Sequence, residues 1–299
     1  MPSQYLQSAD YAAYGLATAT AQQVTQASVL IDGYLKRPGG LIYVADSAGN
    51  PAYMAALSAE MTFTGAAGFG AGAAVQVPVS GPVAALQIGD CVLIDRAGTP
   101  EAAQVTAING NILTFATIAS SHLTGCTIET GLFITEKRYV PKNRSEVVLA
   151  YPPVVRVVGG TGRYGYGRRG DQAAYNMDNF NLLASLSKFG GPPAWEIWPA
   201  NTSAGIDAGT GMLWIPAGIM LAYYSEIKVR YVAGYNYANL PSEIKLACAQ
   251  TIQALANNPQ LGDVSGYKAG DTAITQISSS ILSQDVKTLL APWRARDFG

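Results

Sequence analysis

The chain has 299 residues, of which 49% are hydrophobic and only 13% are charged, and its formal net charge is −1. This length and composition allow a buried core in one large domain or two smaller ones, and the near-zero net charge excludes a global field that attracts nucleic acid. Soluble domains carry about 25% charged residues. We therefore expect either an uncharged polar surface or extensive coverage by partner subunits, because interface cores are poor in charge.

The cysteines and the hydropathy pattern limit where the protein is located. Cys91, Cys126 and Cys248 are odd in number and widely spaced, so they predict neither a disulfide framework nor a metal site. A reducing cytoplasm is the expected compartment of folding. The first residues lack the pattern of a signal peptide, and no apolar stretch approaches the roughly 18 residues of a membrane span. We expect no membrane-spanning segment.

Near the N-terminus, two segments have helical character. Residues 3–17 predict a short helix that ends at Gly15. After Thr20, a typical N-cap residue, apolar residues follow helical spacing until Pro38 stops the element. The residues of this apolar stripe are Val24, Ala27, Leu30, Ile31, Tyr34 and Leu35.

Residues 41–235 have the pattern of strands, hairpins and glycine-rich loops. Residues 41–140 predict a small barrel or sandwich, with strands at 91–95, 104–108, 112–115 and 127–134 and a loop at 65–72. Asn109-Gly110 predicts a tight hairpin, because both residues tolerate positive φ. Residues 141–235 predict further hairpins, with strands at 146–149, 154–158, 195–198, 212–215 and 226–232 and a short helix within 172–189.

The helical pattern returns after residue 240. Pro241 suits the first position of a helix, which ends near Asn257, and a second helix begins at Ser283 and is stopped by Pro292. The apolar stripe of the first helix consists of Ile244, Ala247, Cys248, Thr251, Ile252 and Leu255. Helices this short bury their apolar faces only against other elements. We therefore predict an α+β fold, in which residues 1–40 and 236–299 form one helical bundle around inserted β regions at 41–140 and 141–235.

A glycine-rich segment, residues 160–165 (GTGRYG), matches the G-x-G-x-x-G pattern of dinucleotide-binding turns. Such a site needs a helix that opens at these glycines, so that its N-terminal amides face the pyrophosphate. The following residues, 166–170 (YGRRG), do not open a helix. The segment therefore predicts a loop and no cofactor.

Basic residues gather around this segment. Eight of the 19 basic residues lie between positions 137 and 169, where Glu146 is the only acid. Arginines that alternate with tyrosines suit phosphate contacts and base stacking, so the predicted loop is a candidate for a DNA-channel or intersubunit contact. Its residues are Arg163, Tyr164, Tyr166, Arg168 and Arg169. The alternatives are a solvated hairpin tip and pairing with carboxylates of a neighbouring subunit.

No catalytic motif stands out. His122 is the only histidine, and its surroundings (SSHLTGC) match neither a nucleophile elbow nor a metal-ligand cluster, so we interpret it as structural. Acidic residues are scattered singly, although hydrolysis by an Asp/Glu pair stays open as an alternative. The sequence therefore predicts no catalytic residue, no metal, no cofactor and no enzymatic activity.

The segment after Pro292 is the strongest candidate for a binding site. Trp293 and Phe298 flank Arg294 and Arg296, and tryptophan and arginine are common at binding hot spots. The segment has no evident groove of its own to fill, so we predict that it binds another protein. The alternative is that Trp293 folds back on the bundle and leaves the rest exposed.

Three segments resemble the head–tail connector, or adaptor, proteins of bacteriophages. They are the N-terminal helix (TAQQVTQASVLIDGYLKR), the strand-to-helix segment VRYVAGYNYANLPSEIKLACAQTIQAL and the C-terminal GDTAIT with LSQDVKTLLAPWRARDF. Residues 232–234 (VAG), 240–241 (LP) and 289–294 (LLAPWR) match the family's Ala-Gly strand end, Leu-Pro helix start and leucine–leucine–proline–aromatic–arginine ending.

The resemblance implies a ring, commonly of twelve subunits, that docks under the portal at the capsid vertex and prolongs the DNA channel toward the tail. The family's C-terminal arm inserts into the portal, a role that would fall here on Trp293, Arg294, Arg296 and Phe298. Small family members lack a β unit like residues 41–140, and the resemblance does not say what this region contacts.

We therefore expect a non-enzymatic virion protein of the neck, assembled in the host cytoplasm. The expected partners are other copies of the chain in a ring, the portal protein, a downstream neck or tail protein and, non-specifically, packaged DNA, with no membrane contact. One alternative is another structural virion part, such as a tail-completion or baseplate protein. The other is a cytoplasmic enzyme that acts on a carbohydrate or nucleotide, suggested by the glycine-rich and aromatic loops.

Overall fold

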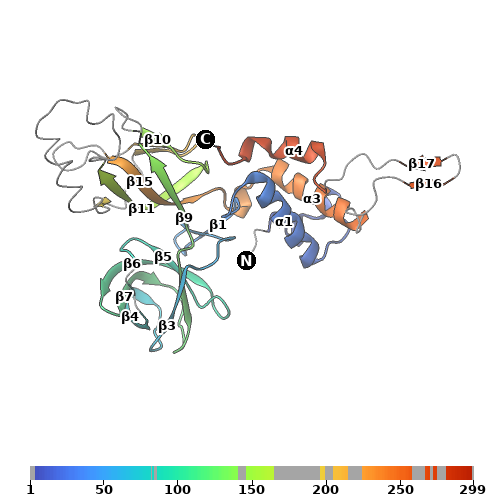
Figure 1. Ribbon diagram of the computed structural model, residues 1–299. Helices are drawn as coiled ribbons and strands as arrows, with labels where there is room; N and C mark the ends of the chain where they lie inside the picture. Colours follow the sequence, from blue (N-terminus) through green and yellow to red (C-terminus); the bar gives the residue numbers. More distant parts are fainter. Residues whose placement is uncertain are drawn as a thin grey trace, which may run out of the picture. The chain divides into compact units, whose positions relative to one another are not determined.

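The computed structural model describes residues 4–81, 83, 86–140, 146–164, 196–198, 205–214, 224–257, 267–269, 272–274 and 281–297. The chain divides into two compact units (Figure 1). The helical unit comprises residues 1–44, 54–58 and 234–297, and the β unit comprises residues 45–53, 59–233 and 298–299. The predicted α+β fold, a helical bundle from both termini with a large antiparallel β insertion, is confirmed.

The helical unit contains three described helices and several 3₁₀ turns. The helices are α1 (Ala21–Leu35), α3 (Ser242–Asn257) and α4 (Gln284–Leu290), and the turns are Ser8–Asp10, Ala12–Tyr14, Tyr237–Asn239 and Ala291–Trp293. α3 packs against both α1 and α4. The helix predicted within residues 3–17 is therefore two 3₁₀ turns, which end at Gly15 with φ 72°. A hairpin of β16 (Tyr267–Ala269) and β17 (Thr272–Ile274), not predicted from the sequence, lies between α3 and α4 in the chain.

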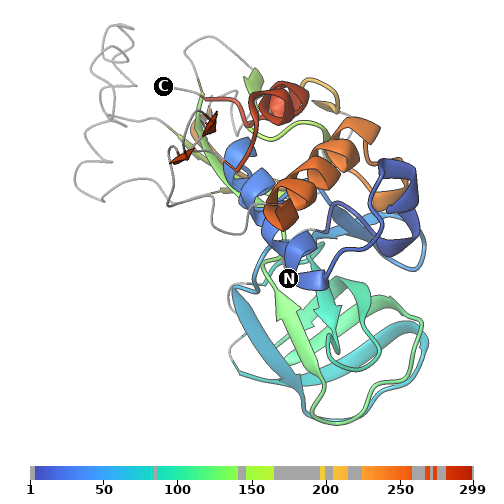
Figure 2. The ribbon, with the colours of Figure 1, turned by 90° about the vertical axis from the view of Figure 1, so that its right-hand side faces the viewer.

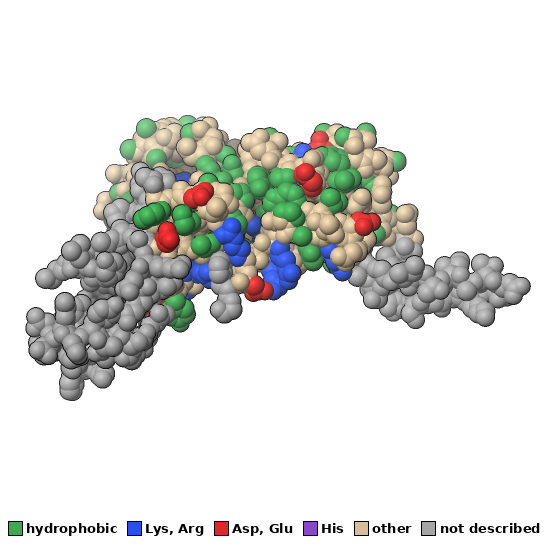
Figure 3. Space-filling view, turned by 90° about the horizontal axis from the view of Figure 1, so that it is seen from above, with side chains coloured by type: hydrophobic (Ala, Val, Ile, Leu, Met, Phe, Trp, Pro, Cys, Tyr) green, Lys and Arg blue, Asp and Glu red, His purple; other side chains and the backbone are tan. Residues whose placement is uncertain are grey.

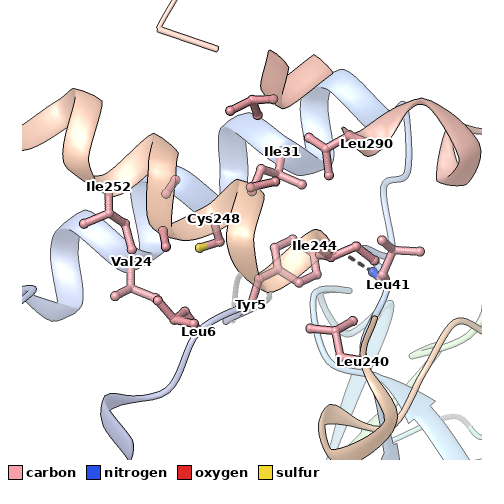
Figure 4. Packing of buried hydrophobic residues seen from close by; sticks show 14 of the residues in the cluster. Tyr5, Leu6, Val24, Ile31, Leu41, Leu240, Ile244, Cys248, Ile252 and Leu290 are labelled. Atoms are coloured by element: carbon pink, nitrogen blue, oxygen red, sulfur yellow. Dashed lines mark hydrogen bonds between the residues drawn. The ribbon is translucent and has the colours of Figure 1, made fainter. Parts of the chain in front are cut away.

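Apolar residues from both ends of the chain form one core. Figure 4 shows side chains of α3 and α1 facing one another, with Tyr5, Leu41 and Leu290 beside them. The facing residues, all at most 3% exposed, are Val24 and Ile31 of α1 and Ile244, Cys248 and Ile252 of α3. Fully burying one large apolar side chain contributes about 1.5–3 kcal/mol. This packing stabilises helices that are too short to be stable alone.

The predicted start of α1 at Thr20 is confirmed. The Thr20 hydroxyl accepts a hydrogen bond from the Gln23 amide at 3.2 Å, and the Gln23 side chain accepts one from the Thr20 amide at 2.9 Å. This reciprocal arrangement is a capping box, which satisfies two amides that have no partner inside the helix.

Gly234 allows the backbone before α3 to contact the backbone after α1. Gly234 has φ 98°, and a Cβ atom at this position would lie 2.3 Å from the Leu41 carbonyl oxygen. The close approach lets the Tyr235 amide donate to the same carbonyl at 2.7 Å, while Tyr43 donates back to the Tyr235 carbonyl at 3.1 Å. Only glycine combines this backbone conformation with this distance.

A polar cluster fastens the N-terminal turns to α3. The Tyr237 hydroxyl donates to Asp10 at 2.6 Å and accepts from the Gln7 amide at 2.8 Å, and Lys245 lies 3.0 Å from the same Asp10 oxygen. The hydrogen bond from Tyr237, followed by the one from Lys245, lowers the pKa of Asp10. Burial and the neighbouring carboxylate raise the pKa of Tyr237.

The β unit contains a closed six-stranded barrel (Figure 2). Its strands are β3 (Met61–Gly65), β4 (Gly72–Ser80), β5 (Cys91–Ile94), β6 (Glu101–Asn109), β7 (Ile112–Ile118) and β8 (Thr127–Thr130), in the order β3-β4-β7-β6-β5-β8. The predicted Asn109-Gly110 hairpin joins β6 to β7, with φ 59° at Gly110. Completely buried residues of the barrel include Val77, Val92, Ile94, Val105, Leu113, Phe115 and Ile128. Of the two architectures predicted for this region, the barrel is the one observed.

The described residues of the β unit form two further sheets, and a small hairpin lies where the chain passes between the two units. A four-stranded sheet has the order β12-β11-β15-β9, from Glu196–Trp198, Val154–Tyr164, Tyr224–Ala233 and Ile134–Tyr139. A three-stranded sheet has the order β10-β14-β13, from Glu146–Val148, Met212–Trp214 and Ile206–Asp207. The hairpin pairs β1 (Tyr43–Ala45) with β2 (Pro51–Met54).

Two predictions about strands are wrong. The single strand predicted at 127–134 is divided between β8 and β9 at Gly131, whose φ is 79° and against which the side chain of Glu60 packs. The loop predicted at 160–165 is a strand as far as Tyr164, because β11 pairs with β12 and β15 along these glycines. The helix predicted within 172–189 lies outside the described residues.

Candidate functional site

The predicted binding segment after Pro292 lies along the C-terminal end of α1. The Ala295 amide donates to the Leu35 carbonyl at 2.8 Å, and the Arg37 Nε donates to the Trp293 carbonyl at 2.7 Å. Leu35 is the last residue of α1, so its carbonyl has no partner within the helix. The C-terminal segment therefore satisfies a helix end that otherwise needs water.

Trp293 is anchored in the helical unit. Its side chain is half-buried against the core, and its Nε1 donates to the Tyr235 hydroxyl at 3.3 Å. This is the arrangement that the sequence left open as the alternative to a free segment. Arg294 and Arg296 are exposed, and Phe298 lies outside the described residues.

The side-chain contacts of Arg294 and Asp297 are exposed. The Arg294 guanidinium lies 5.8 Å from the centre of the Tyr34 ring, a cation–π contact. Lys36 lies 2.6 Å from Asp297, where its hydrogen bond lowers the pKa of that carboxyl group, and their side chains are 47% and 84% exposed. Solvent and salt screen such pairs. The segment thus combines an anchor at Trp293 and Ala295 with exposed side-chain contacts at Arg294 and Asp297.

The second predicted site, the arginine–tyrosine segment, is only partly described. Arg163 and Tyr164 are the last residues of β11, where their backbones pair with Glu226 and Tyr224. Tyr166, Arg168 and Arg169 lie outside the described residues.

Other basic residues of the same region have contacts inside the β unit. Arg156 donates to the Pro51 carbonyl at 3.0 Å and to the Cys91 sulfur at 3.2 Å. Arg138 lies 3.3 Å from the Glu136 carboxylate. The basic cluster seen in the sequence therefore includes side chains that stabilise the β unit as well as exposed ones.

An ion pair that the sequence did not predict joins the barrel to the four-stranded sheet. Arg230 of β15 donates to both carboxylate oxygens of Asp90, at 2.6 and 2.8 Å, and also to the side chain of Gln87. Burial raises the pKa of Asp90, and the charge of Arg230 opposes this effect. A Cβ atom at Gly159 would lie 2.9 Å from the guanidinium, so the strand glycine makes room for Arg230.

His122 lies between β7 and β8 in the chain and forms a bridge with Phe69. Its side chain has no exposed surface, and its ring nitrogens lie 3.5 Å from a Glu101 oxygen and 3.7 Å from an Asp95 oxygen. Its ring centre is 5.1 Å from that of Phe69. A completely buried side chain reaches no substrate, which supports the structural interpretation of His122. Within the described residues, no group of three or more His, Cys, Asp or Glu side chains is arranged to hold a metal ion.

Only 13% of the residues in the chain are charged. On the face shown in Figure 3, acidic and basic side chains form small groups among uncharged ones. Several large apolar side chains are exposed: Leu123 (83%), Ile88 (60%), Tyr139 (60%), Trp214 (54%) and Val29 (52%). Such side chains on a surface poor in charge are typical of interface cores.

Neither models of known protein families nor curated proteins match this sequence. Among the helices that the structure describes, none has both the length and the apolar character needed to cross a membrane.

Proposed function

We propose that the protein is a non-enzymatic component of the phage neck, a head–tail connector that forms a ring, of twelve subunits, between portal and tail and prolongs the DNA channel. The observation that carries the proposal is the convergence of the three connector-like segments. α1, the Gly234 turn that leads into α3, and α4 with the segment after Pro292 share one helical unit. Their folding into one core supports the proposal, because the three segments are then parts of a single unit.

Ring formation is supported by the surface. Low charge and exposed apolar side chains such as Leu123 and Trp214 suit burial against other protein chains. A closed ring of identical subunits uses one pair of complementary patches repeatedly, so every such patch is covered in the assembly. The assembled ring belongs to the virion and forms in the host cytoplasm.

The C-terminal segment is the proposed portal-binding element. Its anchor, Trp293, fixes where the segment leaves the bundle, and the contacts of Arg294 and Asp297 are exposed enough to be exchanged for contacts with a partner. Arg294, Arg296 and Phe298 would supply the contacts to the portal. The portal would compete only with the exposed side-chain contacts, while the hydrogen bonds of Trp293 and Ala295 can keep the segment in place.

A pull-down with candidate portal proteins tests this role. We expect deletion of residues 293–299 to abolish attachment. Because the deletion also removes hydrogen bonds to α1, a second variant, Arg294→Ala with Arg296→Ala, changes only exposed side chains and is expected to weaken attachment at least about tenfold, or 1.4 kcal/mol. Lys287→Ala on α4 is the control for loss of positive charge. Full attachment by the truncated chain contradicts the proposed role.

Electron microscopy of the purified protein, alone and with candidate portals, tests the proposal as a whole. Rings with the symmetry of the portal are expected. Crosslinks from the C-terminal segment identify its neighbour, since a tail-completion or baseplate protein would crosslink to tail components. A monomer at all concentrations, with no ring on the portal, contradicts the connector function.

A further inference from the structure

The four-stranded sheet of the β unit has one buried face and one polar face. The buried positions of β15 are Ile227, Val229 and Tyr231, each with an exposed fraction of 0%. They alternate with Lys228 and Arg230, which therefore belong to the opposite face. Strand partners that lie directly opposite share a face, so the register places Lys137 of β9 and Thr161 of β11 on either side of Lys228.

Two lysines stand directly opposite each other on the polar face. Lys137 and Lys228 are both exposed and are paired in the register of β9 and β15. Like charges in such a pair repel each other and destabilise the sheet. A negatively charged ligand beside Lys228 would reduce this repulsion, so the pair favours an anionic ligand.

Carboxylates neutralise the charges of Lys137 and Arg230 on this face but not the charge of Lys228. Glu226, which is only 3% exposed, lies 3.2 Å from Lys137, and Asp90 neutralises Arg230. In the described part of the chain, no carboxylate pairs with Lys228. The face therefore keeps an uncompensated positive charge beside a second, exposed ammonium group.

The neighbours of the lysines suit a polyanion with a regular backbone. Tyr139 is 60% exposed, and the Lys137 Nζ lies 5.3 Å from the centre of its ring. Thr135 is exposed on the same face, and Thr161 is half-buried beside Lys228. Ammonium groups, hydroxyls and an accessible aromatic ring are the groups with which proteins contact phosphates and stack on sugars or bases.

We propose that this lysine face, defined as Thr135, Lys137, Tyr139, Thr161 and Lys228, binds the phosphodiester backbone of DNA without sequence preference. The inference rests on the proposed connector function, to which it adds the surface that contacts the DNA in the channel. Each subunit contributes a small excess of positive charge, and a ring repeats this charge around its axis. An acidic protein surface is a different partner, and the experiment below separates the two.

DNA binding by the purified full-length protein tests the proposal. Affinity for mixed-sequence duplex DNA is measured by fluorescence anisotropy over a series of salt concentrations, with wild type and Lys228→Gln compared. Removing Lys228 breaks no ion pair among the described residues and relieves the repulsion with Lys137, so we expect unchanged or higher thermal stability. We expect weaker DNA binding and a salt slope that is lower by about 0.9 for each phosphate that the variant no longer neutralises.

Lys287→Gln, on α4 of the helical unit, is the matched control, because it removes the same charge elsewhere. We expect it to bind DNA like wild type. The proposal is overturned if Lys228→Gln and wild type have the same DNA affinity and the same salt slope. It is also overturned if Lys228→Gln and Lys287→Gln weaken DNA binding equally, because the effect then comes from net charge alone. A third outcome also overturns the proposal: Lys228→Gln binds DNA like wild type but no longer captures a neck or tail protein. That result would assign the lysine face to an acidic protein partner.

The same variant separates this inference from the connector function. If Lys228→Gln forms rings that attach to the portal while its DNA binding equals that of wild type, only the lysine face is wrong. If wild type forms no ring on the portal, the connector function fails whatever the DNA measurements show.

Discussion

The helical unit and the β unit differ in the sequence separation of the residues that contact each other. In the barrel, β6 and β7 pair across a turn of two residues. In the helical unit, the hydrogen bond from Gln7 to Tyr237 spans 230 residues. Contacts between remote segments form only after a large loop has closed. The helical unit therefore depends on contacts between remote segments. The barrel combines pairs of strands that are neighbours in the chain, β3–β4, β5–β6 and β6–β7, with pairs of more distant strands, β4–β7, β5–β8 and β3–β8.

The two units also differ in what they bury. Among the described residues, the buried charged side chains of the β unit are Asp90, Glu136 and Glu226, whereas Arg37 is the one found in the helical unit. Paired buried charges are costly to disturb, because the remaining partner stays without compensation. The β unit should therefore respond most strongly to loss of a charge, and the helical unit to disturbance of its apolar and backbone contacts.

The largest expected effect is in the β unit. Arg230→Met leaves Asp90 buried without its partner, which should lower the free energy of unfolding by about 3–5 kcal/mol. The pKa of Asp90, already raised by burial, should rise further. The folded state then binds this proton more tightly than the unfolded chain does, so the variant should lose stability as pH rises through the two pKa values.

Chemical denaturation of this variant at acidic and neutral pH, with hydrogen exchange to locate the destabilised region, checks the prediction. The second variant, Arg230→Met with Asp90→Leu, removes both charges and should recover most of the stability. Weaker protection confined to the helical unit would contradict the division of roles between the units.

A somewhat smaller effect is expected where the ends of the chain meet. Gly234→Ala adds a Cβ atom 2.3 Å from the Leu41 carbonyl and forces alanine to φ 98°, which should cost about 2–4 kcal/mol. Gly110→Ala is the control: φ is 59°, but no atom lies within 4 Å of its added Cβ, so we expect about 1 kcal/mol. Equal destabilisation of the two variants, measured by urea denaturation, would show that the close approach to Leu41 contributes nothing.

The smallest effect concerns the polar cluster of the N-terminal turns. The pKa of Asp10 is lower in the folded state than in the unfolded chain, because Tyr237 and Lys245 stabilise its charged form. Its contribution is therefore present above the unfolded pKa, about 3.9, and is lost as pH falls through the lower folded pKa. Asp10→Asn should lower the melting temperature at pH 7 and approach wild type in acid. A pH-independent difference between the two proteins contradicts this assignment.

Local sequence signals predicted the parts of the fold that depend on neighbouring residues. The capping box at Thr20, the hairpin at Asn109-Gly110 and the periodicity of α1 and α3 are patterns within one or two turns of chain. The strands β3 and β4 were not predicted, and the glycines of β11 were assigned to a loop. Their strand conformation follows from pairing with β12 and β15 and from the space that Arg230 requires at Gly159.

The candidate sites divide in the same way. Composition alone identified the arginines and tryptophan after Pro292 and the basic residues around 137–169. The contact of Trp293 with Tyr235 and the pairing of Arg230 with Asp90 join residues 58 and 140 positions apart. The opposition of Lys137 and Lys228 likewise depends on strand register, which no spacing within one strand specifies.

Periodicity and composition act over short stretches of chain, and they were sufficient to predict apolar helices near both ends and a β-rich middle. Three other properties followed from the folded chain alone: which surfaces remain exposed, which charges are paired and where the C-terminal segment lies. These properties depend on contacts between residues far apart in the chain, and such contacts exist only once the chain has closed on itself.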